Sequence, residues 1–127
     1  MHLRSAMDEE HCAREALQDL AVLYLSELPA MVQLIRQDVT LSQAKNEASL
    51  LSIAAGRTHQ LRGTAGALGF LEISKIAGRL DHCLSDAAGL DQSCAPADYT
   101  AISNLVVQLE QAIQTEQAHD SALPILL

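Results

Sequence analysis

The sequence contains few aromatic residues and more acidic than basic ones. Of 127 residues, two are tyrosine, one is phenylalanine and none is tryptophan. Proteins that bind single-stranded nucleic acid usually stack successive bases on several aromatic side chains, and three aromatic residues in the whole chain do not provide such a platform. Sixteen acidic residues against eight basic ones give a net charge of −8, and such a surface repels phosphate backbones. Both features exclude nucleic acid as a partner, and the charge also argues against an acidic membrane surface.

Cysteine pairs and long apolar runs are also missing. The three cysteines, Cys12, Cys83 and Cys94, are odd in number and are not spaced as a redox pair or a metal motif. No secretory leader pattern opens the chain, and no apolar run approaches the roughly 20 residues of a membrane span. We therefore expect a cytoplasmic protein with reduced thiols and no membrane insertion. The apolar tail, residues 123–127, is too short to span a bilayer. It either packs against one end of the fold, which we favour, or stays unpacked.

The sequence does contain helical periodicity, and its length fits one domain over residues 1–127. From about residue 12 to 39, apolar residues recur in steps of three and four, which predicts one buried helical face. Pro29 predicts a kink or break in this helix, with Ser26 as a cap for the second piece. The polar stretch 40–47 is expected to be the first connection. The predicted buried face consists of Leu17, Leu20, Ala21, Tyr24, Leu28, Met31, Val32, Ile35 and Val39.

Three further helices are expected. The second covers about 46–68 and stops at Gly69, which readily adopts a left-handed backbone conformation. The third starts near Phe70 and ends within 86–95, and the fourth starts at Pro96 and fades over 115–121. These patterns predict an all-α, antiparallel up-and-down four-helix bundle with a short N-terminal extension, a core over about 12–117 and a tail over 118–127. The expected core of the last two helices is Ile73, Ile76, Ala77, Leu80, Leu84, Ile102, Leu105, Val106, Leu109, Ala112 and Ile113.

The second helix carries an unusual exposed face. Its apolar arc comprises Leu50, Ile53, Ala54, Leu61, Ala65 and Leu68. His59 lies roughly 160° from the centre of that arc and should stand in water. Glycine inside a helix costs about 1 kcal/mol relative to alanine, so several glycines around one histidine suggest close approach by another molecule. Two other interpretations stay open, namely a histidine that merely faces solvent and glycines that pack a neighbouring helix. The small residues around His59 are Ser52, Ala55, Gly56, Gly63 and Gly66, with Arg62 one turn on.

The run from Thr58 to Gly69 resembles the signature of histidine-containing phosphotransfer domains. That signature is a histidine, any residue, leucine, a basic residue, glycine, serine or threonine, alanine and a later Leu-Gly pair. The similarity extends to Leu28-Pro29 in the first helix. It also extends to Leu80-Asp81, where the family commonly has Leu-Glu.

The resemblance implies that His59 carries a phosphoryl group passed between aspartates of receiver domains. A neutral imidazole is a good nucleophile near pH 7, and we expect the outward-facing far nitrogen to attack. Arg62 would neutralise the phosphoryl charge, at a position where the family more often has lysine. Thr64 is expected to play a structural role by bonding to a carbonyl of its own helix. The surface expected to dock the partner is Ala55, Gly56, Gly63 and Gly66.

The resemblance also implies a phosphocarrier with no ATP-dependent kinase activity and no cofactor or metal of its own, since the receiver supplies the Mg²⁺. The expected partners are response-regulator receiver domains, including that of a hybrid sensor kinase, and we expect a monomer. Met1 favours a whole small protein over an excised domain. The adjacent pairs His11-Cys12 and His82-Cys83 point about 100° apart on a helix, which is poor geometry for one metal. Two alternatives remain: a degenerate adaptor or inhibitor that docks without transfer, and an unrelated helical peptide-binding module.

Overall fold

Four α-helices make up the described part of the chain in a computed structural model. The structure describes the backbone of residues 6–89 and 98–126, and the side chains of 12–89 and 98–119. Within these ranges no residue is in a β-strand, and no helix is long and apolar enough to cross a membrane. The prediction of an all-α fold is therefore confirmed. The helices are α1 (Ala6–Lys45), α2 (Leu51–Ala67), α3 (Leu71–Ala87) and α4 (Tyr99–Leu126), with a short 3-10 helix, η1 (Ala48–Leu50), before α2.

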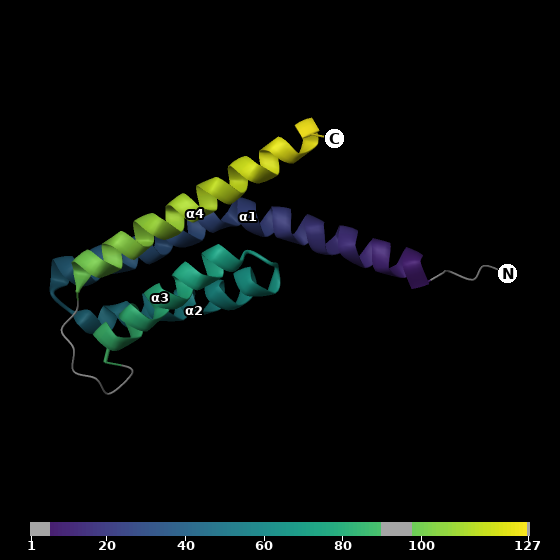
Figure 1. The fold of residues 1–127 in the computed structure, drawn as a ribbon. Helices are drawn as coiled ribbons and strands as arrows, with labels where there is room; N and C mark the ends of the chain where they lie inside the picture. The colour runs from purple at the N-terminus through teal and green to yellow at the C-terminus, as the bar shows by residue number, and fades with distance from the viewer. Residues whose placement is uncertain (1–5, 90–97, 127) are drawn as a thin grey trace.

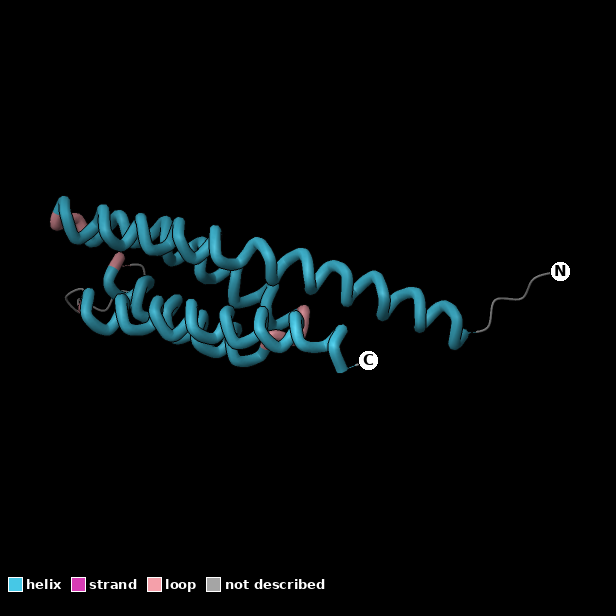
Figure 2. Tube along the Cα trace, turned by 90° about the horizontal axis from the view of Figure 1, so that it is seen from above, coloured by secondary structure: helices cyan, strands magenta, loops and turns pink. Residues whose placement is uncertain are grey.

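The helices form an antiparallel bundle in which each contacts its neighbours in the chain. α1 packs on α2 and α4, and α3 packs on α2 and α4, as expected for an up-and-down arrangement (Figure 1). α2 and α3 make the most extensive contact and form a hairpin beside the α1–α4 pair. The N-terminal part of α1 extends beyond the other helices, as the view from above also shows (Figure 2). We therefore look for the functional site on the part of the bundle in which all four helices pack together, and not on the extended part of α1.

α1 is one continuous helix from Ala6 to Lys45, which excludes the break that was one of the two outcomes predicted at Pro29. The other outcome, a kink, agrees with the change of direction about midway along α1 (Figure 1). Proline has no N–H to offer the carbonyl four residues earlier, which belongs to Leu25. Gln117 of α4 satisfies that carbonyl, because its Nε2 donates to the Leu25 oxygen at 3.3 Å. The Ser26 hydroxyl caps no second helix and donates instead to the Leu23 carbonyl at 2.6 Å. A contact from another helix, which no local pattern contains, thus satisfies the carbonyl that Pro29 leaves without an amide partner.

The helix ends agree with the sequence in part. Gly69 and Gly89 have φ of 89° and 75° and end α2 and α3, as predicted for Gly69. The expected connection over 40–47 is mostly helix, because α1 runs to Lys45 and ends where Asn46 takes φ of 51°. α4 also runs past the predicted fading over 115–121. Pro96 and the side chains of the tail from residue 120 on lie outside the described residues.

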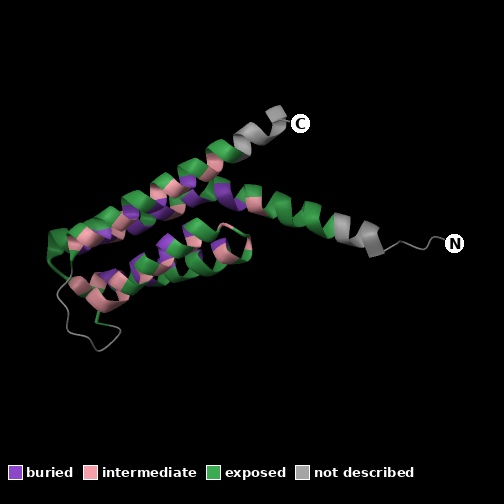
Figure 3. Cartoon of the chain, in the orientation of Figure 1, coloured by how far each residue is buried: buried purple, intermediate pink, exposed green. Residues whose placement is uncertain are grey.

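The core combines apolar side chains from all four helices. Leu28, Leu61, Leu80 and Leu109 have no exposed surface, and every apolar residue predicted for the third helix is buried. The expected burial of Leu17 and Leu20 is wrong. Leu17 is 52% and Leu20 is 54% exposed. The N-terminal part of α1 extends beyond the other helices and is mostly exposed where its side chains are described (Figure 3). The periodicity located the buried face correctly but did not show where the neighbouring helices stop.

Candidate functional site

His59 lies in the middle of α2 on its solvent side. Its side chain is 75% exposed, whereas the adjacent Thr58 is fully buried. The Thr58 hydroxyl donates to the Ala54 carbonyl at 2.7 Å, which satisfies it inside the core. The register of α2 is therefore fixed by a buried face that includes a threonine, and this register turns His59 outward.

The centre of the buried face of α2 differs from the one predicted. Ala55, expected to dock a partner, is only 3% exposed and packs in the core, whereas Ile53, expected in the core, is 54% exposed. The apolar pattern treated Thr58 as polar and gave Ile53 its place in the arc. Because Thr58 bonds within its own helix, it occupies the core at little cost. The docking role predicted for Ala55 is therefore wrong.

The glycines of α2 fall into two kinds. A Cβ atom added at Gly56 or Gly63 would meet nothing within 4 Å, so no neighbouring helix requires glycine there. A Cβ at Gly66 would lie 3.1 Å from the Ser74 hydroxyl of α3. That hydroxyl donates to the Arg62 carbonyl at 2.9 Å, so α2 and α3 approach closely at this level. Gly66 is a packing residue, whereas Gly56 and Gly63 leave open surface on the side of His59.

A carboxylate from α3 contacts the His59 ring. Nδ1 of His59 lies 3.0 Å from Oδ2 of Asp81, whose side chain is 13% exposed. The Ser85 hydroxyl donates to the other carboxylate oxygen at 3.3 Å. With Nδ1 occupied by Asp81, Nε2 is the ring nitrogen available to an incoming group. Sequence reasoning did not assign Asp81 a role, although the Leu80-Asp81 pair of the resemblance pointed to this position.

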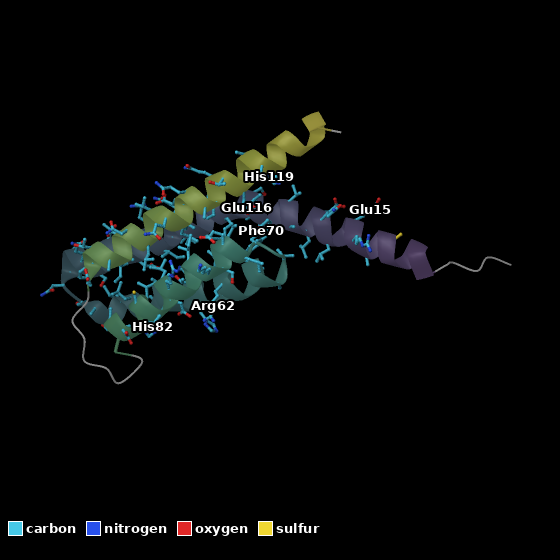
Figure 4. All side chains as sticks on the ribbon, in the orientation of Figure 1. Glu15, Arg62, Phe70, His82, Glu116 and His119 are labelled. Atoms are coloured by element: carbon cyan, nitrogen blue, oxygen red, sulfur yellow. The ribbon has the colours of Figure 1, made fainter. Side chains whose placement is uncertain are left out.

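Arg62 reaches the same carboxylate from one helical turn further along α2. Its Nη1 atom lies 4.0 Å from Oδ2 of Asp81, and its side chain is 55% exposed. Figure 4 shows it on the outer side of the hairpin, away from α4. The structure thus brings together His59, Arg62 and Asp81, of which the sequence predicted the first two. An exposed nucleophilic nitrogen, a nearby cation and a carboxylate on the inner nitrogen suit transfer of an anionic group.

Thr64 supports the site differently from the prediction. Its side chain hydrogen-bonds to the Tyr24 side chain of α1, and the Tyr24 hydroxyl donates to the Leu61 carbonyl at 3.3 Å. Burial raises the pKa of Tyr24, and the hydrogen bond with Thr64 opposes part of that rise. The bond to a carbonyl of the same helix is made by Thr58. Thr64 therefore links α2 to α1.

The other histidines form no metal cluster in the part of the chain described. His82 pairs with Asp86 one turn on, with 3.4 Å between Nε2 and Oδ2. No group of three or more potential metal-binding side chains comes together among the described residues. The side chain of His11 lies outside them. Burial, with the nearby Asp86 and Asp98 carboxylates, raises the pKa of the Cys83 thiol.

A groove between α1 and α4 bears on the peptide-binding alternative. It has a volume of about 180 Å³ and is lined by residues such as Pro29, Val32 and Ile113, none of which belongs to α2 or α3. Small-molecule sites usually measure about 300–1,000 Å³, so this groove is small even for such a ligand. It offers little support for a peptide-binding module.

A comparison with protein families gives a match over most of the bundle. A family model described as the Hpt domain matches residues 19–119, from α1 through most of α4. Searches of curated proteins and of solved structures gave no significant match. The matched range is well over half of the chain and contains His59, Arg62 and Asp81 in the arrangement described above. The chain therefore belongs to the family of histidine-containing phosphotransfer (Hpt) domains.

Proposed function

We propose that this protein accepts a phosphoryl group on His59 from a receiver-domain aspartate and passes it to the aspartate of a response regulator. Membership of the Hpt family implies histidine phosphotransfer in phosphorelay signalling. The assignment to His59 is supported above all by the 3.0 Å contact between its Nδ1 and Asp81 on an exposed helix face. This contact gives the two ring nitrogens different roles.

The reaction follows from that difference. In this proposal Nδ1 carries the ring proton and its N–H donates a hydrogen bond to the Asp81 carboxylate, so Nε2 carries the lone pair. Nε2 attacks the phosphorus of the aspartyl phosphate, the N–P bond forms, and the bond from phosphorus to the aspartate oxygen breaks. The aspartate leaves as a carboxylate, and no proton has to leave Nε2. The Asp81 carboxylate stabilises the positive charge that develops on the ring. Return transfer to a second receiver reverses these steps.

Arg62 supplies positive charge to the transferring group. Phosphoryl transfer has a loose transition state and depends more on positioning and charge neutralisation than on covalent assistance. Arg62 lies one turn from His59 on the same helix, within reach of oxygens on a phosphoryl group bound to Nε2. In this proposal it is a catalytic residue that contacts the phosphoryl oxygens, and Asp81 is a positioning residue.

The open surface at Gly56 and Gly63 would receive the partner. The receiver would contribute its aspartate and the Mg²⁺, so this protein needs no cofactor of its own. We place the relay in the cytoplasm, between the receiver of a hybrid sensor kinase and a response regulator, with this protein acting as a monomer and a phosphocarrier.

The direct test is transfer from a phosphorylated receiver domain to the wild-type protein and to His59→Gln. We expect the wild-type protein to acquire acid-labile, base-stable phosphate, with a phosphorus NMR signal for attachment at Nε2. His59→Gln should keep its circular dichroism spectrum and take up none, because exposed substitutions rarely change stability by more than about 0.5 kcal/mol. Phosphate on the variant, mapped to His82, would overturn the assignment. Receiver binding without any transfer to the wild-type protein would indicate an adaptor instead.

A further inference from the structure

Gly78 of α3 lies directly beneath the Arg62 side chain. A Cβ atom added at Gly78 would lie 3.4 Å from Nε, 3.5 Å from Cδ and 3.8 Å from Cζ of Arg62. These are the three atoms nearest to that position, and all belong to one side chain. The space left by the missing side chain of Gly78 is thus occupied along one edge by the arginine.

The backbone does not explain the glycine. The glycines of the described chain with positive φ are Gly69 and Gly89, so Gly78 has a helical conformation that any residue adopts. Glycine inside a helix lowers stability relative to alanine. The feature that distinguishes this position from the rest of α3 is the arginine lying across it.

Three successive levels of the α2–α3 contact show what that placement does. At the first level, Gly66 meets Ser74, and at the second, Arg62 crosses Gly78. At the third, His59 meets Asp81. The arginine therefore runs along α3 toward the third level, where its Nη1 atom lies 4.0 Å from the Asp81 oxygen that contacts His59.

We propose that Gly78 is a positioning residue that seats Arg62 beside His59. This inference rests on the proposed phosphotransfer function and extends it to a residue outside the transfer site. The Arg62 side chain starts on α2 and ends in a planar guanidinium, which is broader than a lysine ammonium. To reach the side of His59 that faces α3, this planar group needs a flat surface on α3 to lie against. A bulky side chain at 78 occupies that surface and moves the cation outward, away from the phosphoryl group.

The test is a double-mutant cycle between Gly78→Leu and Arg62→Ala, measured as single-turnover transfer from a phosphorylated receiver. Because misplacing a charged contact weakens it without removing it, we expect Gly78→Leu to slow transfer by roughly three- to tenfold. Gly78→Ala should have a smaller effect. In the Arg62→Ala background, Gly78→Leu should change the rate no further. Gln111→Leu, which places the same side chain at an exposed position of α4 without changing the charge of the protein, is the matched control and should transfer at the wild-type rate.

A second measurement separates this inference from the proposed function. In the unphosphorylated protein, the NMR signal of the Arg62 ¹⁵Nε–Hε group should shift in Gly78→Leu and show greater mobility of the side chain. Gly78→Gln is a second bulky variant for the case that leucine disturbs folding, and it should have the same effect on this signal. An equal slowing by Gly78→Leu with and without Arg62 would overturn the inference, because it would indicate obstruction of the receiver. An unchanged Arg62 signal would overturn it as well. Failure of the wild-type protein to accept phosphate would instead refute the proposed function, and the Arg62 signal would still decide the role of Gly78.

Discussion

The α2–α3 hairpin and the α1–α4 pair differ in charge and in surface. Residues 51–87, which include both hairpin helices, contain four of the eight basic residues of the chain but only three of its sixteen acidic residues. The remainder of the molecule carries nearly all of the negative charge. The α1 surface exposes six large apolar side chains, whereas α2 and α3 together expose two, Ile53 and Leu71. Those of α1 are Leu17, Leu20, Val22, Leu23, Leu34 and Leu41.

In the proposed function this difference would suit the two halves to different demands. The donor would be an anionic aspartyl phosphate, which a protein of charge −8 would repel unless the approach surface were less acidic than the rest. The hairpin provides such a surface and keeps it free of bulk at Gly56 and Gly63. The long helices supply much of the apolar core against which the hairpin packs. Changes in the hairpin should therefore affect transfer, and changes in the long helices should affect stability.

The largest expected effect is on partner access. Gly63→Glu should abolish detectable transfer, because it adds bulk and negative charge beside the phosphoryl group. Nothing lies within 4 Å of the new Cβ, and glutamate is a better helix former than glycine, so the fold should be retained or slightly stabilised. The measurement is transfer from a phosphorylated receiver, with Gly63→Ala as the control that adds a Cβ without charge. Wild-type transfer by the glutamate variant would show that the receiver docks elsewhere.

The corresponding change in the long helices is Leu28→Ala. Leu28 has no exposed surface, and truncating a buried leucine usually costs about 2–5 kcal/mol. Urea unfolding should show this loss, while the folded fraction of the variant transfers phosphate at the wild-type rate. Leu17→Ala is the matched control on the same helix. Because Leu17 is 52% exposed, we expect a change of about 0.5 kcal/mol or less. A large loss at Leu17 would mean that the extended part of α1 is covered in solution.

Arg62→Ala should slow transfer by roughly ten- to a hundredfold, since a hydrogen bond to a charged group contributes about 1.5–3 kcal/mol. The effect should apply in both directions and leave His59 able to accept phosphate. Arg62→Lys restores most of the rate if only the charge matters, and little if the planar guanidinium is required. Single-turnover transfer rates distinguish these outcomes, with circular dichroism as the check on folding. An alanine variant as fast as the wild-type protein would show that Arg62 is only a surface residue.

The smallest expected effect is on alkaline stability through Tyr24. Burial raises its pKa above the ordinary value of 10.0, so the unfolded chain ionises at lower pH than the folded one. The contribution of Tyr24 to stability is therefore fully present below pH 10.0 and is lost as the pH rises through the folded pKa. Tyr24→Phe should show a flatter decline in the free energy of unfolding above this pH, measured by urea denaturation. Parallel declines in the two proteins would show that Tyr24 ionises equally in both states.

The sequence predicted most of the fold because apolar periodicity reports the buried face of a helix directly. All five apolar residues expected to be buried on α3 are buried. The pattern was misleading where burial depends on the extent of a neighbour, as at Leu17, or on a local hydrogen bond, as at Thr58. The partner of the carbonyl that Pro29 leaves without an amide could not be predicted, because it is a side chain from α4, 92 residues from that carbonyl.

The candidate site was predicted in its local part only. His59 and Arg62 share one helix, so their spacing was readable from the sequence. Asp81 and Gly78 belong to α3, and their positions relative to α2 depend on how the two helices are aligned. No pattern within either helix fixes that alignment. The family resemblance did include the Leu80-Asp81 pair, but it gave Asp81 no role.

The proline in α1 has a consequence for the alignment of the long helices. Apolar stripes on two helices can slide past one another by a full turn and still bury leucine against valine. Pro29 removes this freedom, because the Leu25 carbonyl that it leaves without an amide partner accepts the Gln117 amide in the observed alignment of α4. A one-turn slip would leave that carbonyl without its partner on the opposite helix. A residue that usually disrupts helices thus favours one register of α1 against α4 among several that hydrophobic packing alone would allow.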